Sequence, residues 1–296
     1  MDKTLLNCSY RVGKKMSTDG TKRPLGRKFA LTLALLLAFL PAYSQVWLGL
    51  DAGVGYASFR DMGVSPVSYY GLGANLGCKV NIELARWSLQ PWQSASFAIY
   101  EDAVDPTLNF SAYGIGSNMG FAMLRTVWNT DHWLLMAGGS LSNYLGFKFN
   151  PNMFNASYGV TDFASLSAVG RICFDIGRHD GDQRNYRLRF YDQLAIAPVS
   201  AALRPGFSYI DNFSGTNDQV GAVLSTYELS AVPFAEWHNE LGASYVMRNG
   251  NRLALAYRWS YLTTHNTGVW RYDEATHFVV ATIDVNIGTR LPLPKE

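Results

Sequence analysis

The sequence predicts an all-β protein: an antiparallel transmembrane β-barrel of about ten strands that follows a cleaved signal peptide. Three observations lead to this prediction. Long stretches alternate between apolar residues and polar residues or glycine, the links between them alternate between short and long, and a secretion-type apolar segment lies near the N-terminus. The expected organisation is an N-terminal extension with signal peptide, residues 1–44, and one barrel domain, residues 45–296.

The N-terminal segment has the three parts of a secretory signal peptide. A basic pair precedes the apolar stretch 29–40, and a small-residue cleavage site ending at Ser44 follows it. The stretch is shorter than the roughly 20 residues that a membrane-spanning helix needs. We therefore expect cleavage after Ser44. A retained N-terminal anchor is the alternative, and Met16 is an alternative initiator because the polar region before the apolar stretch is unusually long.

Residues 70–84 show the alternation most clearly. One set of alternate positions is apolar or amphipathic, and the other contains only glycine and polar residues. A strict period of two is the pattern of a β-strand with unlike faces. The same pattern recurs at 46–56, 164–176 and 279–288. Less regular strands are expected at 87–101, 108–127, 132–149, 185–199, 232–248 and 252–262.

The length of these stretches favours a membrane barrel over a soluble architecture. A periplasmic β-sandwich that binds a small ligand would also alternate, but sandwich strands typically run about 5–6 residues. A tilted membrane strand needs about 9–11 residues, and the longest stretches here exceed that. Only helices and closed barrels satisfy every backbone group inside lipid, so we expect a closed barrel with its apolar side outward.

The links between the strands provide an independent test. If the N-terminus lies in the periplasm, every second link should be a short periplasmic turn and the others should be longer outer loops. The expected turns are 85–86, 128–131, 178–184 and 249–251, and the expected loops are 58–67, 102–107, 150–162, 200–231 and 263–275. Residues 200–231 are long enough to contain another hairpin, so a barrel of twelve strands is the alternative.

The alternation also assigns a face to each residue. Leu72, Leu76, Val80 and Ile82 are expected to face lipid. Charges of both signs fall on the other face, so we expect ion pairs inside a lumen that is narrow or plugged at about ten strands. The predicted lumen-lining residues are Asn75, Lys79, Glu83, Arg171, Asp175, Arg187, Arg189, Glu236, His238 and Glu240.

Candidate catalytic residues exist, but a structural role is the favoured interpretation. Glu236, His238 and Glu240 share one strand face with Ser244, and a hydrolase would need a serine and histidine in contact with an orienting polar group. Because Ser244 is displaced along the strand, we interpret these residues as a ladder of interior hydrogen bonds. Asp131 and His132 match an aspartate–histidine protease only by adjacency, and they fall in an expected periplasmic turn.

Metal, cofactor and nucleic-acid sites are not expected. The segment around His179 and Asp180 has the composition of a solvated turn and does not complete a calcium loop. No phosphate loop, dinucleotide motif or paired-cysteine zinc spacing occurs. The net charge of +2 and the low overall charge argue against nucleic-acid binding. Cys78 and Cys173 fall on opposite strand faces, which makes them a poor disulfide pair.

Together these features resemble an outer-membrane β-barrel protein of a Gram-negative, Bacteroidota-like bacterium, without a specific family. Gln45 directly after Ser44 is similar to the processing site common in secreted proteins of that group. The resemblance implies location in the cell outer membrane, contact with outer-membrane lipid and insertion by the barrel assembly machinery. Such barrels often finish on an aromatic residue. Here the last strand ends at Gly288 and is followed by eight residues with no terminal aromatic.

The expected function is non-enzymatic: a structural, adhesive, narrow-pore or accessory role, the last with another envelope protein as partner. The alternatives are a surface-acting hydrolase of lipid or peptide and a periplasmic sandwich. Recognition sites concentrate on loops held by a rigid scaffold. We therefore expect binding through the outer loops 150–162 and 200–231, with Tyr209, Asp211 and Phe213 as contact residues.

Overall fold

The computed structural model describes residues 45–62, 65–84, 86–102, 112–151, 158–180, 183–205, 227–265 and 271–287, all within one compact unit, Pro41–Glu296. Within these ranges, no helix is long and apolar enough to cross a membrane. The described elements are β1 (Gln45–Asp61), β2 (Ser65–Glu83), β3 (Trp87–Asp102), β4 (Ala112–Asn129), β5 (Trp133–Phe149), β6 (Tyr158–Asp180), β7 (Gln183–Pro205), β8 (Tyr227–Val232), β9 (Glu236–Val246), β10 (Arg252–Thr263) and β11 (Tyr272–Asn286).

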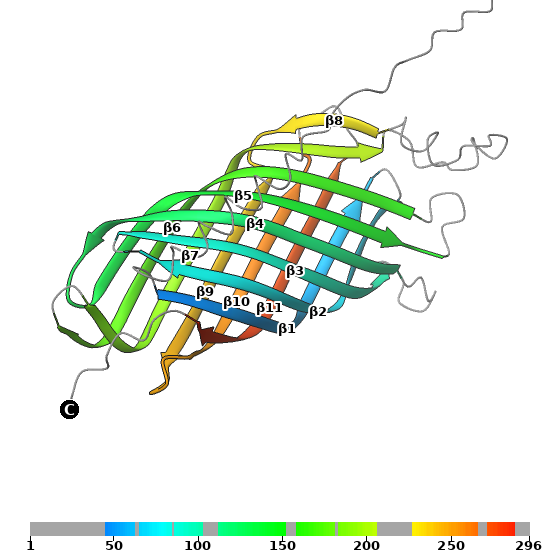
Figure 1. Cartoon of the computed structure of the whole chain (residues 1–296). Helices are drawn as coiled ribbons and strands as arrows, with labels where there is room; N and C mark the ends of the chain where they lie inside the picture. The colour runs from blue at the N-terminus through cyan, green and yellow to red at the C-terminus, as the bar shows by residue number, and fades with distance from the viewer. Residues whose placement is uncertain are drawn as a thin grey trace, which may run out of the picture. The chain divides into compact units, whose positions relative to one another are not determined.

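These strands form one closed antiparallel barrel (Figure 1). Each strand pairs with its sequence neighbours, except that β9 pairs with β7 in place of β8, and β1 pairs with both β2 and β11 to close the wall. β8 and β9 share one position in the wall, because β9 pairs with the first half of β7 and β8 pairs with its last residues. The eleven segments therefore make a ten-strand barrel. The sequence prediction of an all-β, antiparallel barrel with ten strands is confirmed.

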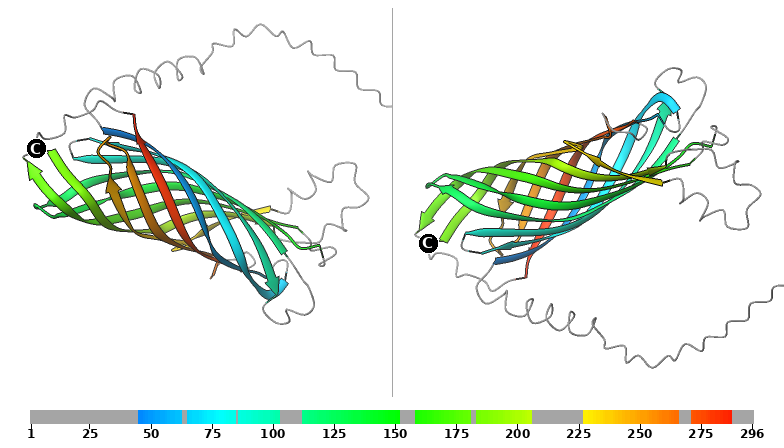
Figure 2. Two further views of the ribbon diagram at one scale, coloured as in Figure 1. Left: turned by 90° about the horizontal axis from the view of Figure 1, so that it is seen from below. Right: turned by 90° about the horizontal axis from the view of Figure 1, so that it is seen from above.

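The strands are strongly tilted, as the oblique views in Figure 2 show. The tilt follows from the register. A row of paired residues that starts at Asp162 passes once around the wall and returns to β6 at Phe174, which is 12 residues further along (174 − 162). Such a stagger requires strands inclined to the barrel axis, as in membrane barrels.

The outer surface of the barrel is apolar. On β1 the alternate residues Leu48, Leu50 and Val54 are exposed, and on β2 Leu72 and Leu76 are 76% and 66% exposed. The intervening positions are buried or half-buried. A closed wall with this apolar exterior is the arrangement that membrane-spanning β-structure requires.

Glycines allow close approach on the inner side of β1. A Cβ atom at Gly49 would collide with the side chains of Asp284 and Lys79, and one at Gly55 would collide with the backbone of His277. Glycine at both positions therefore avoids a collision with the neighbouring strands.

Several predicted element boundaries are wrong. Residues 58–61, 158–162, 200–205, 227–231 and 272–275, which were expected in outer loops, are strand residues, and the expected turn 178–184 is strand up to Asp180 and again from Gln183. Hydrogen-bonded pairing between neighbours extends the strands past the point where alternation fades, as Asp61 opposite Tyr272 shows. Residues 1–44 and 206–226 lie outside the described ranges.

One strand of the wall is interrupted. β8 ends at Val232 and β9 begins at Glu236, with Pro233 between them and Phe234 in the left-handed region at φ 53°. The Trp237 indole donates a hydrogen bond to the Phe234 carbonyl oxygen over 3.2 Å and holds this turn. Proline has no N–H to donate, so the turn falls where the ladder must stop.

Candidate functional site

The barrel interior holds the candidate site, and its two ends differ. The name "turn end" is used for the end with the short hairpins, where Gln45, Glu83 and Arg252 lie. The opposite end, where Asp61, Lys148 and Tyr272 lie, is called the "loop end".

The turn-end half contains a network of ion pairs between nearby strands. Arg258 on β10 binds Glu240 on β9 at 2.9 Å and Asp51 on β1 at 3.2 Å. Asp51 also faces Lys79 at 3.5 Å and accepts a hydrogen bond from the Thr282 hydroxyl at 2.7 Å. Lys79 and Glu240 thus lie in one network of alternating charge.

Arg252 and Glu83 close the rim of the turn end. The Arg252 guanidinium lies 3.2 Å from Glu83 and stacks over the Trp47 ring, with 3.5 Å to the ring centroid. The Trp47 indole in turn donates to the Gly250 carbonyl oxygen. Glu83 keeps a third of its side chain exposed, so this pair is in contact with water.

A second interior network involves β6 and β7. Asp175 and Arg189 form a bidentate ion pair at 2.6 and 2.8 Å. Arg171 donates to Gln193 on β7 at 2.8 Å and reaches Gln90 on β3 at 2.7 Å. The bidentate geometry fixes both partners more firmly than a single contact would.

The remaining predicted lumen residues differ in their surroundings. Asn75 is buried and donates to the Ala95 carbonyl oxygen at 3.3 Å. Arg187 is exposed near the start of β7. Glu236 is buried and accepts a hydrogen bond from Ser142 on β5 at 3.1 Å.

The loop-end half contains a group of residues that sequence reasoning missed. Lys148 on β5 pairs with Glu274 on β11 at 2.6 Å. Glu274 also accepts hydrogen bonds from the hydroxyls of Tyr144, at 2.7 Å, and Tyr272. Lys148 donates to the Tyr100 hydroxyl at 3.2 Å. β5 and β11 lie opposite each other in the ten-strand ring, so this "plug cluster" of Lys148, Glu274, Tyr100, Tyr144 and Tyr272 spans the lumen.

A second ion pair lies beside the plug cluster. Arg204 on β7 binds Asp61 on β1 at 2.5 Å and donates to the Thr161 hydroxyl at 3.1 Å. Its guanidinium lies 4.6 Å from the Tyr272 ring centroid. Arg204 is 1% exposed, and the strands that it joins are not neighbours in the wall.

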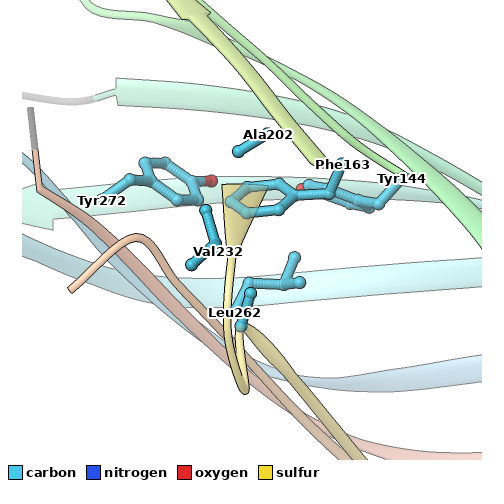
Figure 3. Packing of buried hydrophobic residues seen from close by; sticks show 7 residues of the cluster. Tyr144, Phe163, Ala202, Val232, Leu262 and Tyr272 are labelled. Carbon is cyan, nitrogen blue, oxygen red and sulfur yellow. The ribbon is translucent and has the colours of Figure 1, made fainter. Parts of the chain in front are cut away.

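Apolar side chains fill the space around these charges. Figure 3 shows Phe163, Tyr272, Val232 and Leu262 converging from different strands. A second group, which includes Phe59 and Tyr69, packs next to Lys148, and those two rings stack at 4.9 Å. Aromatic and charged side chains from several strands therefore pack together inside the loop-end half of the barrel.

For one of the missed residues, the sequence pattern could have predicted the interior position. Lys148 lies between Phe147 and Phe149 in a predicted strand, so the alternation could have placed it inside. Asp61 and Glu274 fell in segments assigned to loops, and Arg204 fell in the loop 200–231. Their interior position follows only from the longer strands.

The residues weighed as a hydrolase site do not form a triad. Within the described residues, the His238 Nδ1 atom is buried without a hydrogen-bond partner, while Glu236 binds Ser142 and Glu240 binds Arg258 and Tyr191. A serine hydrolase needs serine, histidine and acid in one hydrogen-bonded chain.

The positions of the other candidate residues from the sequence are as follows. His132 contacts the Asp175 carbonyl oxygen at 3.1 Å from the turn before β5. Among the described residues, no group of three or more His, Cys, Asp or Glu could hold a metal ion. Cys78 and Cys173 are free thiols, one exposed and one buried. Tyr209, Asp211 and Phe213 lie outside the described residues.

Comparison with known proteins shows similarity of fold alone. No protein-family model and no curated protein matches the sequence. The fold is similar to that of Neisserial surface protein A (NspA), with 13% identity, 81% of this chain and 97% of that chain covered, and a TM-score of 0.27. It is similar to the transport unit of the autotransporter AIDA-I from Escherichia coli, with 9% identity, 83% and 90% covered, and a TM-score of 0.37. It is also similar to the toluene transporter TodX of P. putida, with 8% identity, 86% and 92% covered, and a TM-score of 0.24.

Proposed function

We propose that this protein is an outer-membrane β-barrel whose lumen is closed to solutes and which serves as a structural or recognition platform. The observation that carries the proposal is the plug cluster. Its ion pair, Lys148–Glu274, joins opposite strands of the barrel, and neither side chain is more than 8% exposed.

The energetics of the plug cluster support a closed lumen. A hydrated ion crossing the loop-end half would have to separate Lys148 from Glu274 or displace the tyrosines bound to them. Removing one partner of a buried ion pair costs about 3–5 kcal/mol, because the other charge is left buried and unpaired. A second buried pair, Arg204–Asp61, spans the same half. Conduction at rest is therefore disfavoured.

The apolar exterior and the expected signal peptide support the outer-membrane location. Recovery in the outer-membrane fraction, resistance to carbonate extraction and heat-modifiable gel mobility are the expected results. Recovery of a soluble periplasmic monomer would contradict this location.

Recognition is assigned to the loop end. The link 206–226 between β7 and β8 is the longest of the chain's links there, and the expected contacts Tyr209, Asp211 and Phe213 belong to it. Deletion of residues 210–219 is expected to leave heat-modifiable mobility intact and to abolish association with a ligand or envelope protein.

Conductance in planar lipid bilayers tests the closed lumen. The purified full chain is expected to show no steady open-channel current. The double variant Tyr144→Ala/Tyr272→Ala removes two plug side chains and is expected to conduct. The matched control, Tyr56→Ala/Tyr113→Ala, removes two tyrosines from the exposed outer face and should remain silent. Steady porin-like conductance of the unmodified protein would refute the proposal.

A further inference from the structure

The outer face of the barrel carries a cation on β4 and an anion on β7, both among apolar side chains. Arg125 and Asp192 are exposed on the outward side of their strands. Arg125 lies between Met123 and Val127, which are 45% and 63% exposed. A charged side chain on the lipid face of a membrane barrel is destabilising. The position of these two charges therefore needs an explanation.

Asp192 lies inside the apolar belt and not at its edge. Four apolar side chains that are between 41% and 55% exposed surround it: Ile172, Phe190, Leu194 and Leu241. Leu241, which is opposite Asp192, lies midway along β9 between the outward-facing aromatic residues Trp237 and Tyr245. Aromatic residues mark the two interfaces of a membrane barrel. The Asp192 carboxylate is therefore at the depth of the hydrocarbon.

Neither charge has an oppositely charged partner among the described residues. The Asn239 amide donates to the Asp192 carboxylate at 2.6 Å, and the Arg125 guanidinium lies 5.7 Å from the centroid of the Trp87 ring. Neither contact neutralises the charge. β5 and β6 separate β4 from β7 in the wall (Figure 1). Three strand spacings of about 4.8 Å each put Arg125 and Asp192 of one chain beyond the reach of an ion pair.

The surface between the two charges consists of small residues. Four of them lie on the outer side of β5 and β6: Ala137, Gly139, Ala168 and Gly170. One row of paired residues runs from Arg125 through Ala137 and Gly170 to Leu194. The stagger of the barrel carries this row toward the loop end, and the step back from Leu194 to Asp192 returns it to about the level of Arg125. A Cβ atom at Gly170 would meet nothing within 4 Å, so a second wall can approach closely here.

A second copy of the chain presents the complementary arrangement. A two-fold axis parallel to the barrel axis, placed beside β5 and β6, turns β4 of one barrel toward β7 of the other. Arg125 of each copy then faces Asp192 of the other copy, so one contact is made twice. Both barrels keep the same orientation in the membrane. The two charges leave the lipid and pair inside a protein interface, as ionisable groups at membrane depth usually do.

We infer that the outer face of β4 to β7 is the interface of a symmetric dimer, in which Arg125 of one copy pairs with Asp192 of the other across the small residues of β5 and β6. A second copy fits because the face carries one charge of each sign on either side of a flat centre. A single cation or anion would leave the other charge uncovered. This inference goes beyond the proposed function, since neither a closed lumen nor recognition by loops requires a second copy.

Cysteine cross-linking of the full chain in lipid vesicles tests the interface. Ala137→Cys places a reporter thiol beside the two-fold axis, in a background where Cys78→Ser removes the exposed thiol. Oxidation with copper phenanthroline should join two copies by a disulfide, which a non-reducing gel shows as a dimer. The matched control is Ala281→Cys on the exposed outer side of β11, opposite β5 in the ring. It should give only the background of random collisions.

Charge reversal identifies the contact. Arg125→Glu and Asp192→Arg, each with the Ala137→Cys reporter, should lower the cross-linked fraction about tenfold, since like charges then meet twice in every dimer. The two variants folded together into the same vesicles should restore cross-linking, because a mixed dimer brings opposite charges together at both contacts. Cross-linking that persists in both single variants, or that the mixture does not restore, would overturn the Arg125–Asp192 interface.

A steric variant covers the case in which the charge-reversed proteins do not fold, which heat-modifiable gel mobility reports. Gly170→Leu points into open space in its own chain and blocks the approach of a second wall, so it should also lower cross-linking at Ala137→Cys. Ala281→Leu adds bulk on the opposite side of the barrel and should leave that cross-linking unchanged. Equal cross-linking of Ala137→Cys and Ala281→Cys in the otherwise unmodified chain would overturn the dimer.

Discussion

The ion pairs in the two halves of the barrel interior differ in their exposure and in the strands that they connect. At the turn end, Arg258, Glu240 and Lys79 keep between 17% and 21% of their side chains exposed, and they connect strands that are close in the wall. At the loop end, Lys148, Glu274 and Arg204 are between 1% and 8% exposed, and their pairs join distant strands.

This difference separates two roles for interior ion pairs. A partly exposed network loses less when one member is removed, because water can replace part of the lost contact. A dry pair surrounded by aromatic rings cannot be replaced in that way. We therefore expect the loss of one charge to cost less in the network of Arg258, Glu240 and Lys79 than in the loop-end pairs.

The largest effect is expected at Glu274. Glu274→Ala leaves Lys148 buried without its anion and should lower the free energy of unfolding by about 3–5 kcal/mol. Urea unfolding in lipid vesicles, followed by tryptophan fluorescence, measures it. The control Lys148→Met/Glu274→Leu removes both charges and should be much milder. A cost for Glu274→Ala below that of Glu240→Gln would invalidate the comparison of the two halves.

The next largest effect is expected from a test of the strand faces, on which the description of both halves depends. Leu76→Arg places a charge on the lipid face and should cost about 2–4 kcal/mol if it lies at the bilayer midplane. Asn75→Arg points into the interior and should cost much less. The same unfolding measurement applies, and equal or reversed costs would show that the assigned faces are wrong.

A smaller effect is expected in the turn-end network. Glu240→Gln weakens one contact of Arg258 while Asp51 stays in place, so the free energy of unfolding should fall by only about 1 kcal/mol. The Tyr191 hydroxyl can still donate to the new amide oxygen. A loss as large as that of Glu274→Ala would mean that the turn end is as dry as the loop end.

The smallest effect is expected at the boundary of the halves. His238 lies between Glu236, which binds Ser142, and Glu240, which binds Arg258. Its buried Nδ1 atom has no partner among the described residues. His238→Leu removes that unpaired atom, so the unfolding free energy should change by less than about 1 kcal/mol. A purified barrel that hydrolyses lipid or peptide, and loses this activity with His238→Ala, would reopen the enzymatic alternative.

Alternation along the chain determined the fold class and the facing of most residues. A period of two is a local property, so Leu76 and Asn75 could be assigned to opposite faces before any strand was paired. The same local rule placed Lys79 and Glu240 inside. It was insufficient at the strand ends, because the extension of β1 to Asp61 depends on its pairing with β11.

Only the tertiary structure decided which interior residues meet. Lys148 and Glu274 are 126 positions apart, and their contact follows from a ten-strand closure with a definite stagger, which brings β5 opposite β11. The interruption between β8 and β9 at Pro233 likewise became visible only once the strands were paired. Alternation is written into consecutive residues, whereas contacts across a lumen depend on the geometry of the whole closed wall, and no local pattern encodes that geometry.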